Sequence, residues 1–316
     1  MSLEIIFLGT GSAVPSKQRN HSSICVKGFG ETFLFDCGEG TQRQMTGAKM
    51  SPMKVNNIFL THLHGDHILG IPGLIQSLGF RAREDALNIF GPKGTEFMVN
   101  AALHMGYSNI GFPVNVYELE AGVILDTDEY CISCIETNHN ITNLSYKIVE
   151  KKKPRFLREK AIALGVKPGP DFGRLHNGEE VIVDGRVVRP EQVLGEKRVG
   201  NSIVYSGDTR PSDDLVDFAR GVDVLIHEST YQDVDCDKAV STCHSTAREA
   251  AGVASRADVD VLILTHISTR YVNSRISKSE ASEVFHNVLL SHDLLHVKVD
   301  STGLKVIFPQ KRLEAD

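Results

Sequence analysis

The chain has 316 residues, of which 41% are hydrophobic and 23% charged, and its formal net charge is −6 at pH 7. This size is ample for a large buried core, and the composition is ordinary for a soluble enzyme. No apolar stretch approaches the ~20 residues that a membrane helix requires, the first residues lack the basic and apolar runs of a signal peptide, and six cysteines in so long a chain do not indicate a disulfide scaffold. We therefore expect a cytoplasmic protein without a membrane partner.

Short apolar runs predict strands from the start of the chain. Residues 3–8 form the first strand, and residues 23–26 and 32–35 form a hairpin. The Gly9-Thr10-Gly11 run is not a dinucleotide-binding fingerprint, because the third glycine and the following helix are missing. Strands then alternate with helices to about His139, and the second half of the chain repeats this order, which predicts two α/β halves built in layers around one site.

The most informative segment is T-H-L-H-G-D-H at residues 61–67, which follows an apolar run typical of a buried strand. Side chains two apart on extended backbone point the same way, so His62 and His64 can share one cation. Gly65 lets the chain turn, and Asp66 and His67 can then face a second cation nearby. Imidazoles with a carboxylate suit zinc or another divalent first-row metal. A polar loop with surface histidines is the alternative, which the tight spacing at a strand end disfavours.

More candidate ligands follow other strand-like runs. They are His139 after residues 130–135, Asp208 after 202–206, His227 and Glu228 after 222–226, and His266 after 261–265. Strands in one or two sheets can bring such ends together at one cleft. A single histidine after a strand is more often ordinary, but this set points to a binuclear metal site.

Cys131 and Cys134 form a C-x-x-C pair inside the strand-like run 130–135. Such a pair can bind a metal or take part in redox chemistry. Because no second pair is present and strand residues alternate between faces, two packing residues on opposite faces are the better interpretation. Cys236 and Cys243 receive no assignment.

The segment 147–174 has a different character from the rest of the chain. It carries nine basic and three acidic residues, an excess of six positive charges, which leaves about −12 on the remainder. Its Lys167-Pro168-Gly169-Pro170 run is stiff and turn-forming. A solvated linker is one interpretation, but an acidic body with one basic arm favours a surface that docks a polyanion.

Towards the end of the chain, apolar spacing predicts a helix that begins at Thr242 or Cys243 and continues through Ala257. After Tyr271 we expect a helix and closing strands, such as residues 304–308, with no functional site. Six further histidines have no motif and are treated as ordinary: His21, His104, His176, His286, His292 and His296.

These residues together resemble a known family. The H-x-H-x-D-H run at 62–67 matches the signature of the metallo-β-lactamase fold, and further motifs resemble the short form of the ribonuclease Z (tRNase Z) family of tRNA 3′-processing endonucleases. Those motifs are P-S-K-Q-R-N at 15–20, the basic arm with Gly169-Pro170, H-E-S-T at 227–230, H-S-T at 244–246 and H-I-S-T-R-Y at 266–271. The similarity runs from Ile6 to about Tyr271, and the combination of motifs is far more specific than the first one alone.

The resemblance implies an α/β fold, the αββα sandwich of two mixed sheets, formed by a single domain over residues 1–316. A flexible arm at residues 150–195 would be inserted in it as a tRNA-docking exosite. The resemblance also implies two zinc ions per subunit: one held by His62, His64 and His139, the other by Asp66, His67 and His266, with Asp208 bridging.

Catalytic roles are implied in the same way. Asp66 would orient the attacking hydroxide and accept its proton, and two metals can clamp the phosphate oxygens. His244 would protonate the leaving 3′ oxygen, supported by Glu228, because a carboxylate beside an imidazole favours its charged form. The alternatives are an ion-pair role for Glu228, a helix-start role for His244, and a packing or supporting role for His227, which we do not expect to be a ligand.

Substrate contacts follow from the resemblance as well. Without it, residues 17–20 would be read as a solvated loop. The expected contacts are Lys17, Arg19 and Asn20 for the RNA 3′ end, Ser268, Arg270 and Tyr271 beside the metals, and Lys151, Lys152, Lys153, Arg155, Gly169 and Pro170 in the arm.

The implied reaction is cleavage of precursor tRNA after the discriminator nucleotide, leaving a 3′ hydroxyl on the tRNA and a 5′ phosphate on the trailer. The implied partners are precursor tRNA and a second copy of the chain in a homodimer, and no DNA is expected. One alternative is a hydrolase of the same fold that acts on small phosphodiesters or thioesters. Another is a non-enzymatic RNA-binding protein with closed structural zinc sites.

Overall fold

The structure is a computed structural model that describes residues 2–106, 110–196, 198 and 200–307, and it divides into two compact units. The larger unit comprises Met1–Asp126, Cys131–Val149 and Asn201–Asp316, and the smaller one comprises Thr127–Tyr130 and Glu150–Gly200. Among the described residues, none of the helices has the length and apolar composition needed to cross a bilayer.

The first sheet of the larger unit has eight strands in the order β19-β18-β1-β3-β4-β5-β6-β7. In chain order they are β1 (Leu3–Gly9), β3 (Ser23–Gly28), β4 (Glu31–Phe35), β5 (Val55–Phe59), β6 (Leu87–Gly91), β7 (Val114–Glu118), β18 (His296–Asp300) and β19 (Gly303–Ile307). The predicted hairpin is confirmed by the antiparallel pairing of β3 with β4, whereas β4 to β7 run parallel. The predicted closing strand is confirmed as β19, although Phe308 lies outside the described residues.

The second sheet has seven strands in the order β17-β15-β14-β13-β10-β9-β8. They are β8 (Gly122–Asp126), β9 (Tyr130–Thr137), β10 (Asn143–Glu150), β13 (Ser202–Tyr205), β14 (Val224–Glu228), β15 (Val261–Thr265) and β17 (Val288–Leu290). Strands β13, β14, β15 and β17 run parallel, and β10 is antiparallel to β13, so both sheets are mixed as predicted.

The division of the chain into two sequential halves is wrong in detail. Strands β8 and β9 come from the first half but belong to the second sheet, and β18 and β19 return from the end of the chain to the first sheet. Each sheet therefore mixes strands from distant parts of the sequence, because pairing is decided by long-range contacts.

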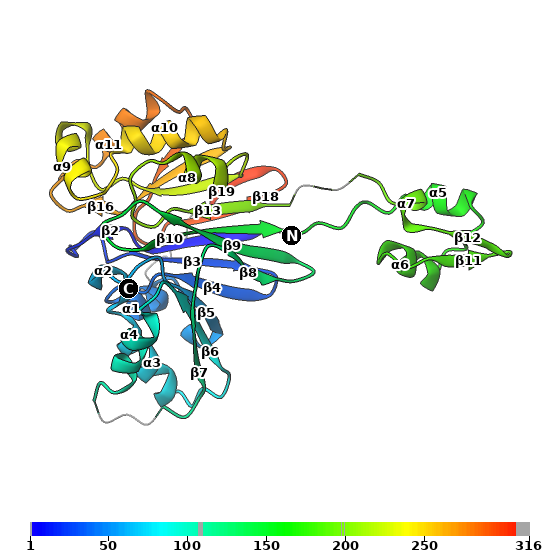
Figure 1. Cartoon of the computed structure of the whole chain (residues 1–316), viewed down its shortest axis with the longest axis horizontal. Coiled ribbons are helices and arrows are strands. Elements are labelled where there is room, and N and C mark those ends of the chain that lie inside the picture. Colours follow the sequence, from blue (N-terminus) through cyan, green and yellow to red (C-terminus); the bar gives the residue numbers. More distant parts are fainter. Residues whose placement is uncertain (1, 107–109, 197, 199, 308–316) are drawn as a thin grey trace, which may run out of the picture. The chain divides into compact units, whose positions relative to one another are not determined.

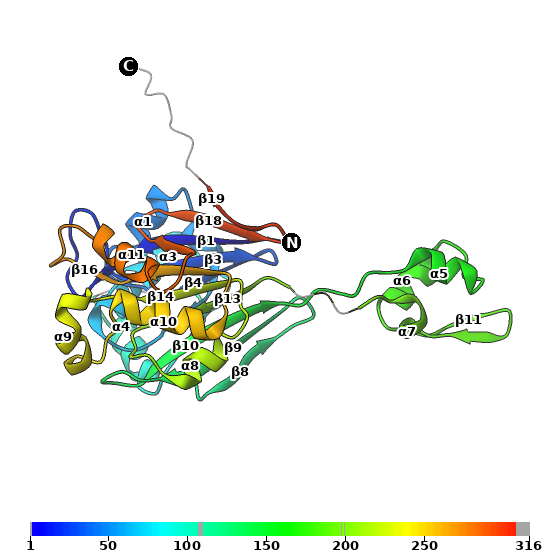
Figure 2. The same ribbon diagram turned by 90° about the horizontal axis from the view of Figure 1, so that it is seen from above.

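Helices cover the outer face of each sheet, which gives the predicted αββα order (Figures 1 and 2). Apolar residues of three helices share a buried cluster with the first sheet: α1 (Thr41–Gly47), α3 (Ile71–Phe80) and α4 (Thr95–Leu103). Three others share a cluster with the second sheet: α8 (Asp213–Phe218), α10 (Ala247–Ala257) and α11 (Arg275–Ser282). The short elements are α2 (Gly65–Ile68), α9 (Cys236–Ser241), the 3-10 turns Pro52–Lys54 and Asp233–Asp235, and the two-residue strands β2 (Gly11–Ser12) and β16 (Ile267–Ser268).

Aromatic side chains fill the space between the two sheets. The rings of Phe35 and Tyr146 lie 5.6 Å apart, and those of Phe59 and Tyr146 lie 5.5 Å apart, so β4 and β5 pack on β10. Tyr205 of β13 also meets Phe35, with ring centroids 6.3 Å apart. Such tilted pairs add specific geometry to the burial of large apolar surfaces, which holds the sheets face to face.

The smaller unit has its own core. It contains α5 (Arg158–Ala163), α6 (Pro170–His176), the antiparallel pair β11 (Val181–Val183) and β12 (Arg186–Val188), and α7 (Pro190–Val193). Its buried cluster consists of Ala161, Val166, Leu175, Val181, Val188 and Val193. The segment predicted as an arm at 150–195 falls within this unit. A cluster of buried apolar side chains shows that the segment is folded, and the linker interpretation is wrong.

The predicted start of the helix before Ala257 is also wrong. Cys243 has a φ of 57°, in the left-handed region, so the helix cannot begin there. The helix begins at Ala247, because the Thr246 side chain caps it by accepting a hydrogen bond from the main-chain N–H of Glu249. The residues between, including His244, stay outside the helix, and their side chains can point elsewhere.

Two smaller expectations have clear outcomes. Cys134 is buried and Cys131 is half-buried on β9, which confirms the packing interpretation. Lys147, counted in the basic segment, belongs to β10 of the larger unit instead, and its Nζ donates to the carbonyl of Phe218 at 2.8 Å.

Candidate metal centre

The candidate ligands stand at the carboxyl ends of strands in both sheets. His62 follows β5, His139 follows β9, Asp208 follows β13 and His266 follows β15. Carboxyl ends of neighbouring parallel strands lie at one edge of a sheet, so the topology brings these side chains together from positions far apart in the chain.

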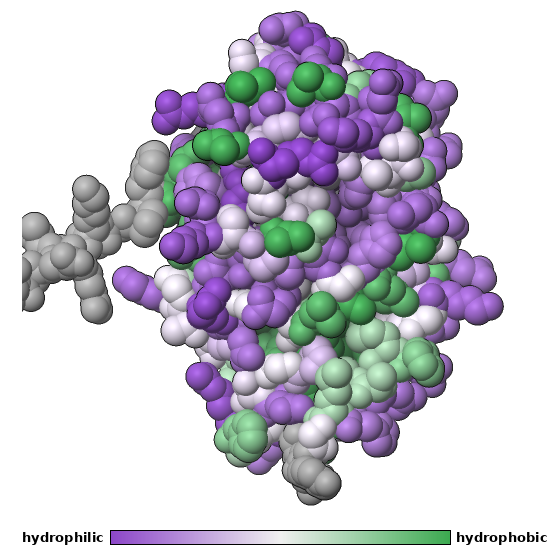
Figure 3. Space-filling model, turned by 90° about the vertical axis from the view of Figure 1, so that its left-hand side faces the viewer, coloured by the Kyte–Doolittle hydropathy of each residue, from purple (hydrophilic) through white to green (hydrophobic). Residues whose placement is uncertain are grey.

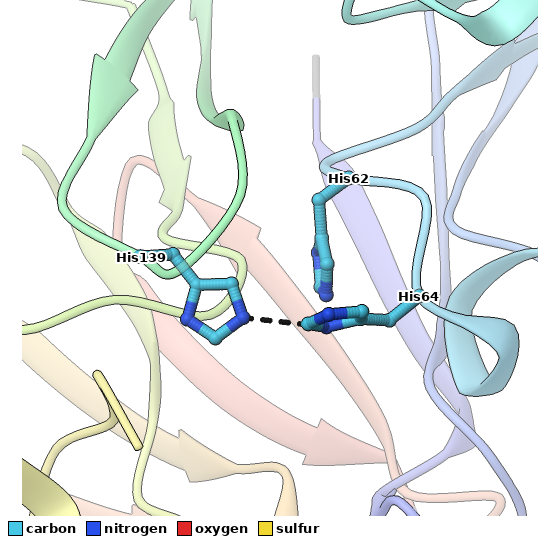
Figure 4. Close-up of side chains that lie close together, drawn as sticks. All are labelled: His62, His64 and His139. Atoms are coloured by element: carbon cyan, nitrogen blue, oxygen red, sulfur yellow. Dashed lines mark hydrogen bonds between the residues drawn. The ribbon is translucent and has the colours of Figure 1, made fainter. Parts of the chain in front are cut away.

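Three histidines form a first group, shown in Figure 4. The ring nitrogens of His62, His64 and His139 lie close enough to hold one ion. His139 Nε2 is 3.3 Å from His64 Nδ1, and the rings of His62 and His64 have centroids 4.7 Å apart. The two histidines of the 62–64 run therefore do face the same space, as their spacing predicted.

A second group consists of Asp66, His67 and His266. His266 Nε2 lies 3.3 Å from Asp66 Oδ2 and 3.3 Å from His67 Nε2. Asp66 and His67 reach this group because they occupy the first turn of α2, which begins at Gly65.

Asp208 lies between the two groups. Its Oδ2 is 3.6 Å from His62 Nε2 and 3.4 Å from His67 Nε2, one histidine of each group. It is nearly fully buried, as are His62, His67 and His266. The structure thus brings together all seven residues that the resemblance implied as metal ligands, in two groups of three joined by one carboxylate.

The donor set fits divalent cations. His62 Nε2 and Asp208 Oδ1 are buried yet have no hydrogen-bond partner among the described residues, and leaving such atoms unsatisfied is costly. Ligands about 2.0–2.1 Å from a tetrahedral zinc are separated by roughly 3.3–3.4 Å along each edge. The contacts of 3.3 Å between ring nitrogens match that spacing, whereas two imidazole nitrogens at this distance make a poor hydrogen bond.

In the absence of a cation, electrostatics favour the protonation states that metal ligands need at His62 and Asp208, but not at His67. Burial lowers the pKa of His62, and the neighbouring His67 lowers it further, so its imidazole is neutral. Burial alone would raise the pKa of Asp208, but the charges of His266 and His67 lower it well below its usual range. For His67, Asp208 and Asp36 outweigh burial and raise its pKa. Asp36 and Asp208 therefore create a negative electrostatic potential in the ligand groups, which favours a proton on His67 and would equally favour a bound cation.

Asp36, which the sequence analysis did not assign, binds residues next to and within the two ligand groups. It is fully buried directly after β4 with a φ of 57°, and it accepts hydrogen bonds from the Thr61 main-chain N–H at 2.8 Å and the Tyr205 hydroxyl at 2.9 Å. Thr61 Oγ1 in turn lies 2.9 Å from His62 Nδ1. Asp36 follows a strand-like run just as the assigned ligands do, and that position was the signal available in the sequence.

Glu228 and His244 form a separate pair beside the ligands. Glu228 Oε1 accepts from His244 Nδ1 at 2.9 Å and from the main-chain N–H of Ser245 at 3.0 Å. Burial alone would lower the pKa of His244, but the charge and hydrogen bond of Glu228 outweigh it and raise the pKa to about 9. His244 Nδ1 is also 3.8 Å from Asp208 Oδ2, so this imidazole stands at the edge of the two ligand groups. His227 is fully buried, and its Nδ1 donates to the carbonyl of Glu228, away from the ligand groups.

Of the loop residues expected to receive RNA, Lys17 alone is exposed. The Arg19 guanidinium donates to the Thr10 hydroxyl at 2.7 Å and to the Ser291 carbonyl at 2.9 Å, and the Asn20 side chain donates to the carbonyl of Glu39 at 2.7 Å. Arg19 and Asn20 are thus engaged in holding the loop.

The loop after His266 lies beside this first loop, because β16 pairs with β2. Tyr271 donates its hydroxyl to Asp235 at 2.6 Å. Arg270 lies over the Tyr231 ring at 5.0 Å, and its Nε donates to Ser268 at 3.1 Å. Arg270 remains exposed, so its charge faces solvent, four residues after the candidate ligand His266.

The residues named in the arm all lie in the smaller unit. Lys152 pairs with Glu150 at 3.3 Å, Lys153 donates to Asn177 at 3.0 Å, and Arg155 is exposed. Lys151 donates its Nζ to the carbonyl of Thr127 at 2.7 Å. Gly169 and Pro170 stand at the start of α6, with Pro170 as its first residue. Their part in binding RNA remains a prediction.

This chain is similar in sequence and in structure to several known proteins. A family model described as "Anti-Pycsar protein Apyc1" matches residues 3–156. Ribonuclease Z of Methanothermobacter thermautotrophicus is 54% identical over 297 residues, covering 94% of this chain and 97% of that protein. The crystal structure of the short form of human tRNase Z superposes with a TM-score of 0.69 at 25% identity, covering 93% of this chain and 98% of that one. The metallo-β-lactamase fold protein YhfI of Bacillus subtilis superposes with a TM-score of 0.68 at 18% identity, covering 94% and 99%. The predicted metallo-β-lactamase fold is confirmed.

Proposed function

Because this chain belongs to the ribonuclease Z family and is a metal-binding endonuclease of tRNA 3′ processing, we propose that it cuts precursor tRNA with two zinc ions held by the seven clustered ligands. The scissile bond would be the phosphodiester after the discriminator nucleotide, so that the tRNA keeps a 3′ hydroxyl and the trailer a 5′ phosphate. The observation that carries this proposal is Asp208, placed between two groups of three ligands.

Each group has a defined part. His62, His64 and His139 would hold one cation, Asp66, His67 and His266 the other, and Asp208 would contact both. Bound divalent cations would supply a water of lowered pKa and positive charge for the phosphate oxygens. The chain itself contributes orientation, since imidazole and carboxylate side chains point at a common space before any substrate arrives.

Two further side chains would move protons. Asp66 accepts a hydrogen bond at Oδ2 from the main-chain N–H of Ala13 at 2.8 Å, which holds its carboxylate beside the other ligands, where it would orient the attacking water and take its proton. His244, kept protonated by Glu228, would donate a proton from Nε2 to the leaving 3′ oxygen. An alkoxide is a poor leaving group, so this donation is needed for RNA.

The smaller unit would grip the body of the tRNA. It has its own core and exposed basic side chains, including Arg155 and Lys153, which suits contact with phosphates without base reading. The larger unit carries 30 acidic and 22 basic residues, a net charge of −8, so a separate basic surface would favour RNA affinity.

We also propose that the protein acts in the cytoplasm as a homodimer. Phe80 at the end of α3 is 84% exposed and Phe97 on α4 is 82% exposed, and large exposed aromatic side chains of this kind favour a protein partner. Figure 3 shows a face of the body that is mainly hydrophilic above and gathers apolar side chains below, at the height of α3 and α4 in Figure 1. Light scattering of Phe80→Glu and Phe97→Glu beside the unchanged protein tests this, and a monomer in all three would contradict it.

The function is tested by metal analysis beside cleavage of a precursor tRNA with mapped product ends. We expect about two zinc ions per chain, one cut after the discriminator, and loss of both metal and activity in His64→Ala and Asp208→Ala. Deleting residues 152–190 should cripple tRNA cleavage but spare hydrolysis of bis(p-nitrophenyl) phosphate. Faster turnover of a small cyclic nucleotide than of precursor tRNA would contradict the proposal.

A further inference from the structure

The segment Cys243–Thr246 lies between α9 and α10 and contacts residues of the candidate metal centre. The carbonyl of Cys243 accepts a hydrogen bond from His139 Nδ1 at 2.8 Å, and the imidazole of the next residue, His244, is bonded to Glu228. One short stretch of main chain therefore sets the direction of a candidate ligand and of the candidate proton donor at the same time. The position of the Cys243–Thr246 segment therefore depends on contacts with other parts of the chain.

Arg210 holds this segment. Its Nη1 donates to the carbonyl of His244 at 2.6 Å and to Glu249 Oε2 at 2.7 Å, and its Nη2 donates to the other oxygen of Glu249. The pairing is bidentate and mostly shielded from solvent, with side-chain exposures of 18% for Arg210 and 23% for Glu249. Both features distinguish it from an ordinary surface ion pair.

The same arginine is tied to two other loops of the site. It lies two residues after Asp208, and its main-chain N–H donates to the carbonyl of Asn138, next to His139, at 2.8 Å. Glu249 accepts a hydrogen bond from the Thr246 main-chain N–H at 2.8 Å, at the start of α10. Arg210 therefore links the loops that carry Asp208, His139 and His244 to the beginning of one helix.

We propose that Arg210 is a positioning residue for the reaction, which fixes the carbonyl of His244 and thereby the direction of its imidazole towards the leaving oxygen. This inference rests on the proposed role of His244 as proton donor. With Nδ1 bonded to Glu228, Nε2 is the nitrogen left to face a substrate in this proposal. A small rotation of the main chain at His244 moves that nitrogen. The loop that carries His139 is still held by the bond from the Arg210 main-chain N–H to the Asn138 carbonyl, which a side-chain substitution does not remove.

A positioning role for Arg210 predicts different effects on two substrates. Precursor tRNA needs a proton on its leaving alkoxide, whereas p-nitrophenolate leaves as a stable anion without one. We expect Arg210→Met to lower kcat on precursor tRNA by roughly 10- to 100-fold, because a displacement of about 1 Å at a reacting group costs this much. Hydrolysis of bis(p-nitrophenyl) phosphate should change by less than about threefold, and bound metal per chain should not change.

The experiment includes three matched variants. Arg210→Lys keeps the charge but not the bidentate geometry and should recover part of the tRNA rate, and it also serves if Arg210→Met does not fold. Arg256→Met removes an exposed arginine paired with Asp213 and should leave both rates unchanged. His244→Ala should show the same separation of substrates as Arg210→Met.

Three results would overturn the inference. The first is an equal loss on both substrates, or a loss of metal, in the Arg210 variants, which indicates a merely structural role. The second is tRNA cleavage at the normal rate by Arg210→Met. The third is an equal loss on both substrates by His244→Ala, which shows that the proposed proton donor itself is wrongly assigned.

Discussion

Asp36 accepts a hydrogen bond from His67 at 2.8 Å between Oδ2 and Nδ1, and both side chains are fully buried. Because a carboxylate only accepts, the proton of the imidazole must sit on Nδ1, which leaves Nε2 directed at Asp66, Asp208 and His266. Asp36 thus decides which nitrogen His67 presents to a metal, from a position 31 residues earlier in the chain.

Replacing Asp36 by asparagine tests this relationship. Asparagine tolerates the left-handed backbone at this position, so the fold should persist, but it carries no charge to raise the basicity of His67. We expect metal affinity to fall by about 10- to 100-fold, measured by competition with a chromophoric chelator. An unchanged affinity in Asp36→Asn would contradict the supporting role.

A pair of glycines offers a matched test of how Asp208 is positioned. Gly207 and Gly221 both have a φ near +60°, so alanine costs each about 1–2 kcal/mol of conformational strain. A Cβ at Gly207 would also meet Asn143 Oδ1 at 2.5 Å and Thr61 Cβ at 2.8 Å, whereas one at Gly221 meets nothing within 4 Å. We expect Gly207→Ala to lose metal and activity, and Gly221→Ala to lose only stability in denaturant unfolding. Equal metal binding by the two variants would refute this account.

The pH dependence of cleavage should report on Glu228. The acid form of His244 exists below its pKa and is lost as pH rises through it, so raising the pKa to about 9 keeps the proton donor loaded at neutral pH. Glu228→Gln removes the charge that raises this pKa. The decline of kcat on precursor tRNA should therefore move to lower pH, while the profile on bis(p-nitrophenyl) phosphate stays where it was. Identical shifts on both substrates would mean that another group titrates.

Asp293 should matter for binding RNA although it lies in the part of the chain where the sequence indicated no site. It accepts hydrogen bonds from the Thr10 hydroxyl at 2.7 Å, the main-chain N–H of Asn20 at 2.7 Å and the Gln44 side chain at 2.6 Å. These contacts hold the loop that presents Lys17. We expect Asp293→Ala to raise KM for precursor tRNA by about tenfold, since hydrogen bonds to a charged group contribute about 1.5–3 kcal/mol each.

The control for this prediction is Asp300→Ala, which removes a carboxylate that bonds its own turn at Thr302. Its KM should match that of the unchanged protein. A fall in kcat on bis(p-nitrophenyl) phosphate in Asp293→Ala would show that the carboxylate supports the metal groups rather than the RNA surface.

Local patterns in the sequence were enough to predict the strands that carry ligands. His62, Asp208 and His266 each follow an apolar run, and such runs report burial directly. The spacing of His62 and His64 also predicted that they face one space, because the two-residue period of a strand is a local property.

Asp293 and Arg210, which support the site from outside the ligand groups, could not be predicted in this way. Asp293 meets Asn20 across 273 positions and Arg210 meets Glu249 across 39, and nothing in their own neighbourhoods marks them. The start of α10 was misplaced for a related reason, since apolar spacing does not register the left-handed backbone at Cys243 or the cap at Thr246. Sheet membership of β8 to β10 depended on strand pairing, which is likewise non-local.

Val149 and Ser202 are register partners in the ladder between β10 and β13, so the chain leaves the nuclease body and re-enters it at neighbouring positions. The inserted residues take the place of a hairpin turn, and the enzyme can gain, lose or exchange them at little entropic cost to the rest of the chain. The RNA-docking role proposed for this unit could therefore evolve independently of the metal-binding residues of the larger unit.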